Sequence, residues 1–180
     1  SPKIILQAFA DVKPELVIAV PLIIEKIIKK NVLPKLETPT MKFLLKVPIV
    51  SDKIKEKVCE QIKGAFGGNF YEVVVGGAAF NQEIEQFMRS INFPYTVGYG
   101  MTECGPIICY EDWNIFKAGS CGKAAPRMEV KILSTDPQNI PGEIITRGDN
   151  VMLGYYTNDG ATKEDGCIQV TLVLWRLKEM

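Results

Sequence analysis

Short apolar runs of strand length alternate with helical patterns through the first half of the chain, and this alternation limits the folds open to it. The runs lie at residues 15–20, 71–75 and 94–97. Strands that alternate with helices predict an α/β fold, with a parallel sheet covered by helices on both faces. Ligands of such sheets bind beyond the carboxyl ends of the strands, so the loops that follow these three runs are the first candidates for a functional site.

Local signals predict where the first helices begin. Ser1-Pro2 is a suitable N-cap and first-turn pair, and Pro21 is suited to open a helix over 22–30. The stretch 34–40 is rich in Pro and Thr and is expected to be loose. In the first helix, the residues expected to face inward are Ile4, Ile5, Ala8 and Phe9.

Two further helices are expected around the second apolar run. Ser51-Asp52 is predicted to cap a helix that reaches about Phe66, where Gly67-Gly68 ends it. Asn81 is predicted to cap the next helix, because a helical apolar spacing follows it. The residues at this spacing are Ile84, Phe87, Met88 and Ile91.

The second half of the chain reads as β-structure. Alternating patterns predict strands over 128–133 and 142–147, with a turn-rich connector between them, and 106–156 shows no helix signal. We therefore predict an α/β part over 1–110 and a β-rich subdomain of the same domain over 111–166.

Composition excludes several classes of function. Lys+Arg and Asp+Glu both number 21, so no basic excess favours nucleic acid as a partner. The chain has no histidine, which excludes imidazole bases, Ser-His-Asp triads and His-ligated zinc within it. Its five cysteines are irregularly spaced and form no Cys-x-x-Cys pair, a pattern that predicts reduced thiols and a cytoplasmic protein.

No segment predicts insertion into a membrane or export. A signal-peptide pattern and an apolar run of about 18 residues are both missing from the sequence. The basic stretch 25–30 is interpreted as a solvated helix face, and contact with a membrane surface is the alternative. Nothing in the sequence indicates an oligomeric state.

Two loops that follow apolar runs carry residues suited to nucleotide chemistry. Gly76-Gly77-Ala78-Ala79 follows one run, and Gly98-Tyr99-Gly100-Met101-Thr102-Glu103 follows the other. Small residues let the backbone approach a flat ring or a phosphate, an aromatic side chain can stack on a base, and one carboxylate can hold Mg²⁺ beside phosphates. Taken singly, Gly76-Gly77 reads as a turn, Tyr99 as a core aromatic and Glu103 as a solvated carboxylate. Their order along the chain favours a nucleotide site without a Walker-type loop.

The hexapeptide 98–103 resembles the signature of the AMP-forming adenylating enzymes, which include acyl-CoA synthetases, peptide-synthetase adenylation domains and luciferases. Five more segments resemble that family in the same order, and the segment 20–26 is most similar to long-chain fatty acid–CoA ligases. The similarity covers residues 1 to about 166. The other four segments are 73–79, Gly119-Ser-Cys-Gly-Lys-Ala124, Gly142-Glu-Ile144 and Asn150-Val-Met-Leu-Gly-Tyr-Tyr156.

This resemblance implies a role for each matching residue. Tyr99 would stack on adenine, and Glu103 would hold Mg²⁺ and act in catalysis together with Thr102. Gly76, Gly98 and Cys104 would contact the acyl group. The residues implied to line the nucleotide are Gly77, Ala78, Ala79, Tyr99, Gly100, Met101 and Thr102.

The implied reaction joins a carboxylate to ATP, giving acyl-adenylate and pyrophosphate, and then forms a thioester with CoA. ATP or AMP, Mg²⁺ and CoA are the implied cofactors, and a fatty acid is the implied substrate. The family's phosphate loop and its small C-terminal domain with a catalytic lysine are not in this sequence. We therefore expect a central fragment of a magnesium-dependent long-chain fatty acid–CoA ligase that is inactive alone. The alternative is a non-catalytic nucleotide- or acyl-binding remnant, or a fragment held by a partner.

The tail 167–180 departs from the family pattern. After Gly166 the resemblance leads us to expect Trp-x-x-Thr-Gly-Asp, whose Asp binds the ribose hydroxyls, but the chain continues Cys167-Ile-Gln-Val170. Shifting the codons back by one base, from the last base of the Asp165 codon, can yield Trp-Leu-His-Thr-Gly-Asp. We interpret the tail as a frameshift, in the gene or in the reading of its sequence. Any codon other than GTG at Val170 would contradict this hypothesis.

Overall fold

The computed structural model describes residues 2–44, 47–69, 71–156 and 168–170. The chain divides into two compact units, residues 1–95 and 96–180. Each is described by itself below. The hypothesis of a frameshifted tail falls on residues that lie, apart from a short strand at 168–170, outside the described part of the chain.

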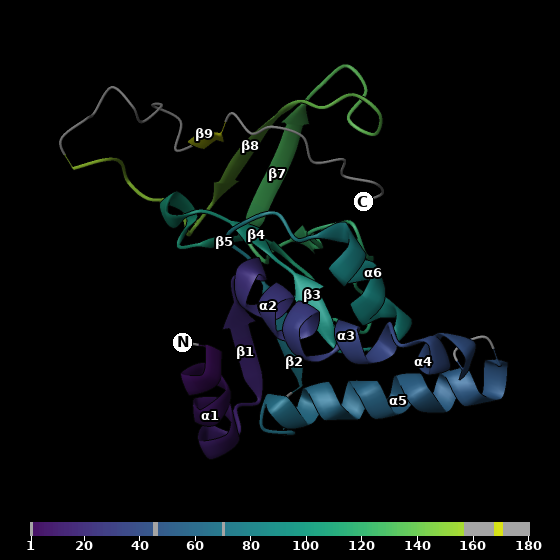
Figure 1. Ribbon diagram of the computed structural model, residues 1–180. Helices are drawn as coiled ribbons and strands as arrows, with labels where there is room; N and C mark the ends of the chain where they lie inside the picture. Colours follow the sequence, from purple (N-terminus) through teal and green to yellow (C-terminus); the bar gives the residue numbers. More distant parts are fainter. Residues whose placement is uncertain (1, 45–46, 70, 157–167, 171–180) are drawn as a thin grey trace. The chain divides into compact units, whose positions relative to one another are not determined.

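The first unit contains a parallel pair of strands and six helices among its described residues, as the alternating pattern predicts. In the sheet, strand β1 pairs with β2 in parallel register from Leu16↔Glu72 to Ala19↔Val75, and the strand order is β1-β2-β3 (Figure 1). The elements in chain order are α1 (Pro2–Val12), β1 (Leu16–Ala19), α2 (Pro21–Asn31), α3 (Leu33–Leu36), α4 (Pro39–Leu44), α5 (Pro48–Ala65), β2 (Glu72–Val75), α6 (Gln82–Ser90) and β3 (Tyr95–Val97), the last running on into the second unit.

The helix limits confirm some local predictions and correct others. Asn81 caps α6 as predicted, because its side-chain oxygen accepts hydrogen bonds from the backbone N–H groups of Glu83 and Ile84. Helix α5 begins at Pro48 and not at Ser51, since proline at the first helical position needs no hydrogen-bond partner for its nitrogen. The stretch expected to be loose also contains helix, because α3 and α4 form there.

A chain of aromatic rings forms part of the core of the first unit. Phe66, just after α5, is 1% exposed; it stacks on Phe9 of α1 at a centroid distance of 5.2 Å and lies 6.1 Å from the ring of Phe93. Positive φ angles at Gly67 (94°) and Gly68 (77°) turn the chain directly after this contact, in the region that favours glycine.

Two predictions about burial were wrong. Ile4 and Ala8 of α1 are exposed, because the half-buried side of that helix is the one that carries Ile5 and Phe9. Helices do not cover both faces of β1, on which Leu16 and Ile18 are 52% and 71% exposed while Val17 and Ala19 are buried.

The second unit is β-rich, and the described stretch 106–156 contains no α-helix, which agrees with the absence of a helix signal there. One antiparallel sheet has the order β4-β5-β6, and the other has the order β7-β8-β9, in which β7 and β8 form a long hairpin (Figure 1). The elements are β4 (Tyr99–Gly100), the 3-10 turn η1 (Thr102–Cys104), β5 (Ile107–Tyr110), β6 (Lys123–Ala124), β7 (Met128–Leu133), β8 (Glu143–Gly148) and β9 (Ile168–Val170). Strands β4 and β5 pair antiparallel to each other. The predicted division into an α/β part over 1–110 and a β-rich subdomain over 111–166 stays a prediction.

Neither a disulfide nor a membrane-spanning helix is found in the described part of the chain. Cys59, Cys104, Cys109 and Cys121 are buried, and none of these four forms a disulfide. None of the helices in that part combines the length and the apolar character needed to cross a bilayer.

The Asn81 cap leads to a stability prediction. Asn81→Ala should lower the free energy of unfolding by about 1 kcal/mol, because two N–H groups at the start of α6 lose their acceptor. Urea denaturation of the wild-type and variant chains measures the difference. Asn81→Asp keeps a side-chain acceptor and should stay close to wild type; equal destabilisation by both changes would contradict the role of the cap.

Candidate functional site

The loop after β2 presents small, exposed residues beside the end of β1. Gly76 N–H donates to the carbonyl of Ala19 at 3.1 Å, so parallel pairing brings the ends of these strands together. Gly77 has a φ of +82°, and a β-carbon there would lie 3.7 Å from a methyl group of Val20. Gly77, Ala78 and Ala79 are exposed, which leaves the backbone of this loop open to a flat ligand.

A tight turn after β4 carries the residues expected to act on the nucleotide. Met101 N–H donates to the carbonyl of Pro106 at 2.8 Å, and Cys104 N–H donates to the carbonyl of Met101 at 3.0 Å. A β-carbon at Gly100 would collide with the carbonyl oxygen of Pro106, so the close approach of these two segments requires glycine there. Between them, Thr102 is exposed and Glu103 is partly exposed.

Glu103 is held by the segment that follows β8. Its side-chain Oε1 accepts a hydrogen bond from Tyr155 Oη at 2.7 Å, and its backbone carbonyl accepts one from Met152 N–H at 2.8 Å. The Tyr155 hydrogen bond, followed by one from the backbone N–H of Glu103 itself, lowers the pKa of this carboxyl below its ordinary value. Both bonds therefore favour the ionised form, which is the form that binds a metal.

Asn150 joins the two ends of the turn. Its side-chain amide donates to the carbonyl of Cys104, 46 residues away in the sequence, and to the carbonyl of Ile107 at 3.0 Å. These carbonyls belong to the end of η1 and the start of β5. One amide group therefore sets the path of the chain on both sides of Gly105-Pro106.

Tyr99 and Cys104 lie at the buried side of the same stretch. The Tyr99 ring is partly exposed, but its hydroxyl is buried and has no hydrogen-bond partner among the described residues. Burial, with smaller effects from three nearby cysteines, raises the pKa of Tyr99. Burial also raises the pKa of the Cys104 thiol, so this group stays protonated and is not suited to act as a nucleophile.

The expected site residues fall into two groups. Residues 98–104 lie together in the second unit, and residues 76–79 lie together in the first. The roles that the resemblance implies for them stay predictions. Sequence reasoning gave no role in the site to Asn150, Met152 and Tyr155, although it matched their segment to the family. Contacts between residues far apart in the sequence produce no periodic sequence pattern. The resemblance of the segment 150–156 to the family was therefore the one signal that could have pointed to these residues.

Glu103 fits a magnesium ion that shares its coordination with phosphates. The described residues contain no group of three or more His, Cys, Asp or Glu that could form an all-protein metal site. Mg²⁺ beside a nucleotide is usually held by one or two carboxylates together with phosphate oxygens and water. One ionised and partly exposed carboxylate is therefore sufficient on the protein side.

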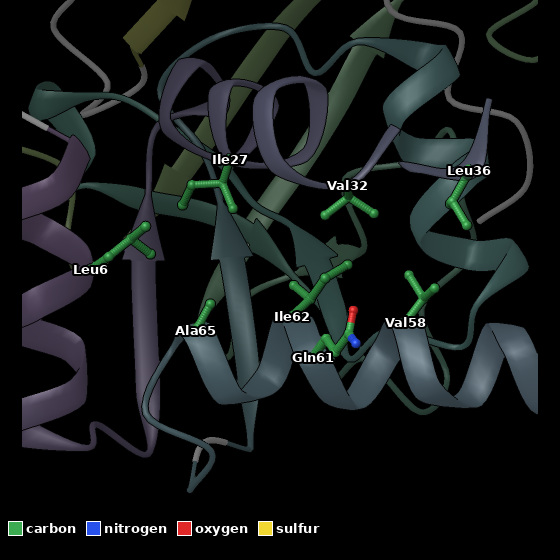
Figure 2. Close-up of a pocket in the computed structure, with 8 residues that line it drawn as sticks. All are labelled: Leu6, Ile27, Val32, Leu36, Val58, Gln61, Ile62 and Ala65. Carbon is green, nitrogen blue, oxygen red and sulfur yellow. The ribbon is translucent and has the colours of Figure 1, made fainter. Parts of the chain in front are cut away.

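An apolar pocket of about 360 Å³ lies within the first unit. Figure 2 shows its side chains, which come from α1, α5 and the region of α2 and α3. Gln61 supplies its one polar side chain and no charged residue lines it, so the pocket offers apolar contact without a reactive group. The lining residues are Leu6, Ile27, Val32, Leu36, Val58, Gln61, Ile62 and Ala65.

Comparisons with known proteins show the family to which the chain belongs. Residues 1–156 match the model of a family described as AMP-binding enzyme. The 4-coumarate:CoA ligase 1 of Petunia hybrida is 39% identical in an alignment of 104 residues that covers 50% of this chain and 19% of that enzyme. The long-chain-fatty-acid–CoA ligase of Escherichia coli O157:H7 is 34% identical in an alignment of 95 residues that covers 49% of this chain and 17% of that enzyme. The chain thus spans less than a fifth of the length of these relatives.

Solved structures confirm the fold. O-succinylbenzoate coenzyme A synthetase from Bacillus subtilis, in complex with ATP and magnesium ion, matches 94% of this chain over 30% of its own, with a TM-score of 0.64 and 19% identity. A benzoate CoA ligase from Burkholderia xenovorans LB400 matches 93% of this chain over 30% of its own, with a TM-score of 0.63 and 16% identity. The predicted fold class, part of the large N-terminal domain of an adenylate-forming enzyme, is therefore confirmed.

The Asn150 contacts yield a prediction about the turn. Asn150→Ala should destabilise the second unit by about 2 kcal/mol, because the carbonyls of Cys104 and Ile107 lose their donor. Hydrogen exchange at the amides of Cys104 and Gly105, which close the turn, should become faster. Asn139→Ala, which removes an exposed hydrogen bond to Asp136, is the matched control. Unchanged exchange at Cys104 and Gly105 would show that Asn150 does not hold the turn.

Proposed function

The chain belongs to the AMP-binding enzyme family, and on this premise we propose that it is the central part of an AMP-forming acyl-CoA ligase. The observation that carries the proposal is the turn η1, which presents the exposed Thr102 and the ionised Glu103 shortly after Tyr99 of β4. An aromatic ring, a hydroxyl and a carboxylate in this order suit a base, a phosphate and a magnesium ion.

Each residue then has a role in the proposed reaction. Tyr99 stacks on adenine, Thr102 donates its hydroxyl hydrogen to an α-phosphate oxygen, and Glu103 holds the magnesium ion. By the same resemblance, the residues of the exposed loop 77–79 contact the adenine and the ribose, and Gly76, Gly98 and Cys104 contact the acyl group. The ion, when bound, neutralises phosphate charge.

The proposed chemistry needs no base from the chain. A carboxylate oxygen of the substrate attacks the α-phosphorus of ATP, the bond between the α- and β-phosphates breaks, and pyrophosphate leaves. The thiol of CoA then displaces AMP from the acyl-adenylate and forms the thioester. Because the attacking carboxylate is already ionised, alignment and charge neutralisation suffice, which agrees with a sequence that has no histidine.

For the acid we propose a long-chain fatty acid, which the E. coli relative and the resemblance of the segment 20–26 support. The identity to 4-coumarate:CoA ligase 1 supports an aryl acid as the second candidate. A cytoplasmic location stays a prediction. The alternative function is nucleotide or acyl binding without catalysis, in a remnant or in a fragment held by a partner.

The metal role of Glu103 leads to a prediction about catalysis. In the full-length protein that carries this sequence, Glu103→Ala should lower pyrophosphate release by about a hundredfold and act mainly on turnover, because charge on the phosphates is then less well neutralised. Pyrophosphate is measured with ATP, Mg²⁺ and palmitate. Glu129→Gln, which alters an exposed carboxylate on β7, is the control and should behave as wild type.

Two results would count against the proposal. Unchanged turnover in Glu103→Ala would contradict the metal role. If the full-length protein bound ATP but released no pyrophosphate from it with any acid tested, this result would favour the non-catalytic alternative. The 180-residue chain alone is expected to release no pyrophosphate above its Glu103→Ala variant.

A panel of acids separates the two substrate candidates. We expect kcat/KM of the full-length protein to be at least about tenfold higher for palmitate than for 4-coumarate, since a pocket that contacts a long chain gains apolar burial with each methylene. Octanoate serves as the intermediate case. A preference for 4-coumarate would overturn the long-chain proposal and leave the adenylating activity standing.

A further inference from the structure

The side chain of Tyr155 adds a contact that the rest of its segment does not require. Its hydroxyl donates to Glu103 Oε1 at 2.7 Å, across 52 residues of sequence. The tyrosine is 43% exposed, so its ring adds little to the core. The hydrogen bond to the carboxylate is thus the main interaction of this side chain that the structure describes.

The backbone of the same segment is fastened to the turn by other groups. Met152 N–H bonds to the carbonyl of Glu103, and the Asn150 amide bonds to the carbonyls of Cys104 and Ile107. These three bonds fix the position of the segment beside the turn without the phenol. The Tyr155 hydroxyl therefore acts on the orientation of one carboxylate more than on the path of the chain.

We propose that Tyr155 is a positioning residue that orients the Glu103 carboxylate for a divalent cation; this inference rests on the metal role of Glu103 proposed above. A free glutamate side chain samples many rotamers, and a metal ligand loses that freedom on binding. The phenol of Tyr155 fixes one carboxylate oxygen before the cation arrives. A carboxylate offers about four lone-pair sites, so one bond from Tyr155 and one from the Glu103 backbone leave positions open for the ion.

The orientation of the Glu103 carboxylate affects how well it can bind Mg²⁺. Mg²⁺ requires near-octahedral geometry at short distances, so a misdirected carboxylate binds it poorly. Hydrogen-bond partners of metal ligands typically change metal affinity by about tenfold to a hundredfold when they are removed. Because both side chains are partly exposed to water, the expected effect of losing the phenol is at the lower end, about tenfold.

Direct metal binding tests the inference without relying on turnover. Mn²⁺ in the presence of ATP is the probe, and its affinity for the full-length protein is measured by electron paramagnetic resonance titration. Tyr155→Phe should weaken Mn²⁺ binding about tenfold, because it removes the hydroxyl and keeps the ring. Tyr156→Phe is the matched control, since the neighbouring tyrosine is 99% exposed and should bind Mn²⁺ as wild type does.

A double-variant cycle shows whether Tyr155 acts through Glu103. In a Glu103→Gln background, Tyr155→Phe should have no further effect on Mn²⁺ affinity. In pyrophosphate assays, Tyr155→Phe should raise the Mg²⁺ concentration needed for half-maximal rate and recover most of the wild-type kcat at saturating Mg²⁺. Both results would support a positioning role and are not expected from a general loss of structure.

The opposing outcomes separate this inference from the proposed function. Wild-type Mn²⁺ affinity in Tyr155→Phe, with weakened binding in Glu103→Gln, would overturn the inference and leave the metal role of Glu103 standing. Equal effects of Tyr155→Phe in both backgrounds would also overturn it, because the tyrosine would then act elsewhere. Wild-type affinity in Glu103→Gln would overturn the metal role itself, and the inference with it.

Discussion

The candidate site depends on the side-chain amide of Asn150, which holds the two ends of the turn that follows β4. It bonds to the carbonyls of Cys104 and Ile107, groups that lie 46 and 43 residues before it in the sequence. Without these bonds, the two carbonyls beside Gly105-Pro106 would need water or another donor. Thr102 is exposed and Glu103 is partly exposed within this turn, whose ends are joined by the hydrogen bond from Met101 N–H to the carbonyl of Pro106.

Backbone groups and side chains have different roles in the site. Backbone contacts, those of Met101 with Pro106 and of Met152 with Glu103, determine where the turn lies. A side-chain contact acts on the Glu103 carboxylate, because the hydrogen bond from Tyr155 lowers its pKa and directs one of its oxygens. This division suits a reaction in which the protein contributes position and charge and the substrates contribute the reacting groups.

Local signals predicted those parts of the fold that local physics decides. The Asn81 cap, the glycines after α5 and the strand Glu72–Val75 depend on neighbours a few residues away, and the structure confirms them. The predicted start of α5 was wrong because two helix-start signals, Pro48 and Ser51-Asp52, lie within a few residues of each other. The helix begins at the proline. The exposure of Ile18 could not be predicted, because which face of a strand is covered depends on elements elsewhere in the chain.

For the site, the motif 98–103 was visible in the sequence, whereas Tyr155 was not assigned to it, since a contact across 52 residues has no spacing rule.

The uncovered face of β1 has a consequence for handling the protein. In the sheet order β1-β2-β3, β1 is an edge strand, and Leu16 and Ile18 project from it with most of their surface accessible to water. An apolar edge of this kind can template the addition of another strand, so it favours self-association as concentration rises. Preparations of the isolated 180-residue chain should therefore be checked by light scattering at each working concentration, because oligomers built on this edge would lower an apparent binding signal without any change in the turn that carries Glu103.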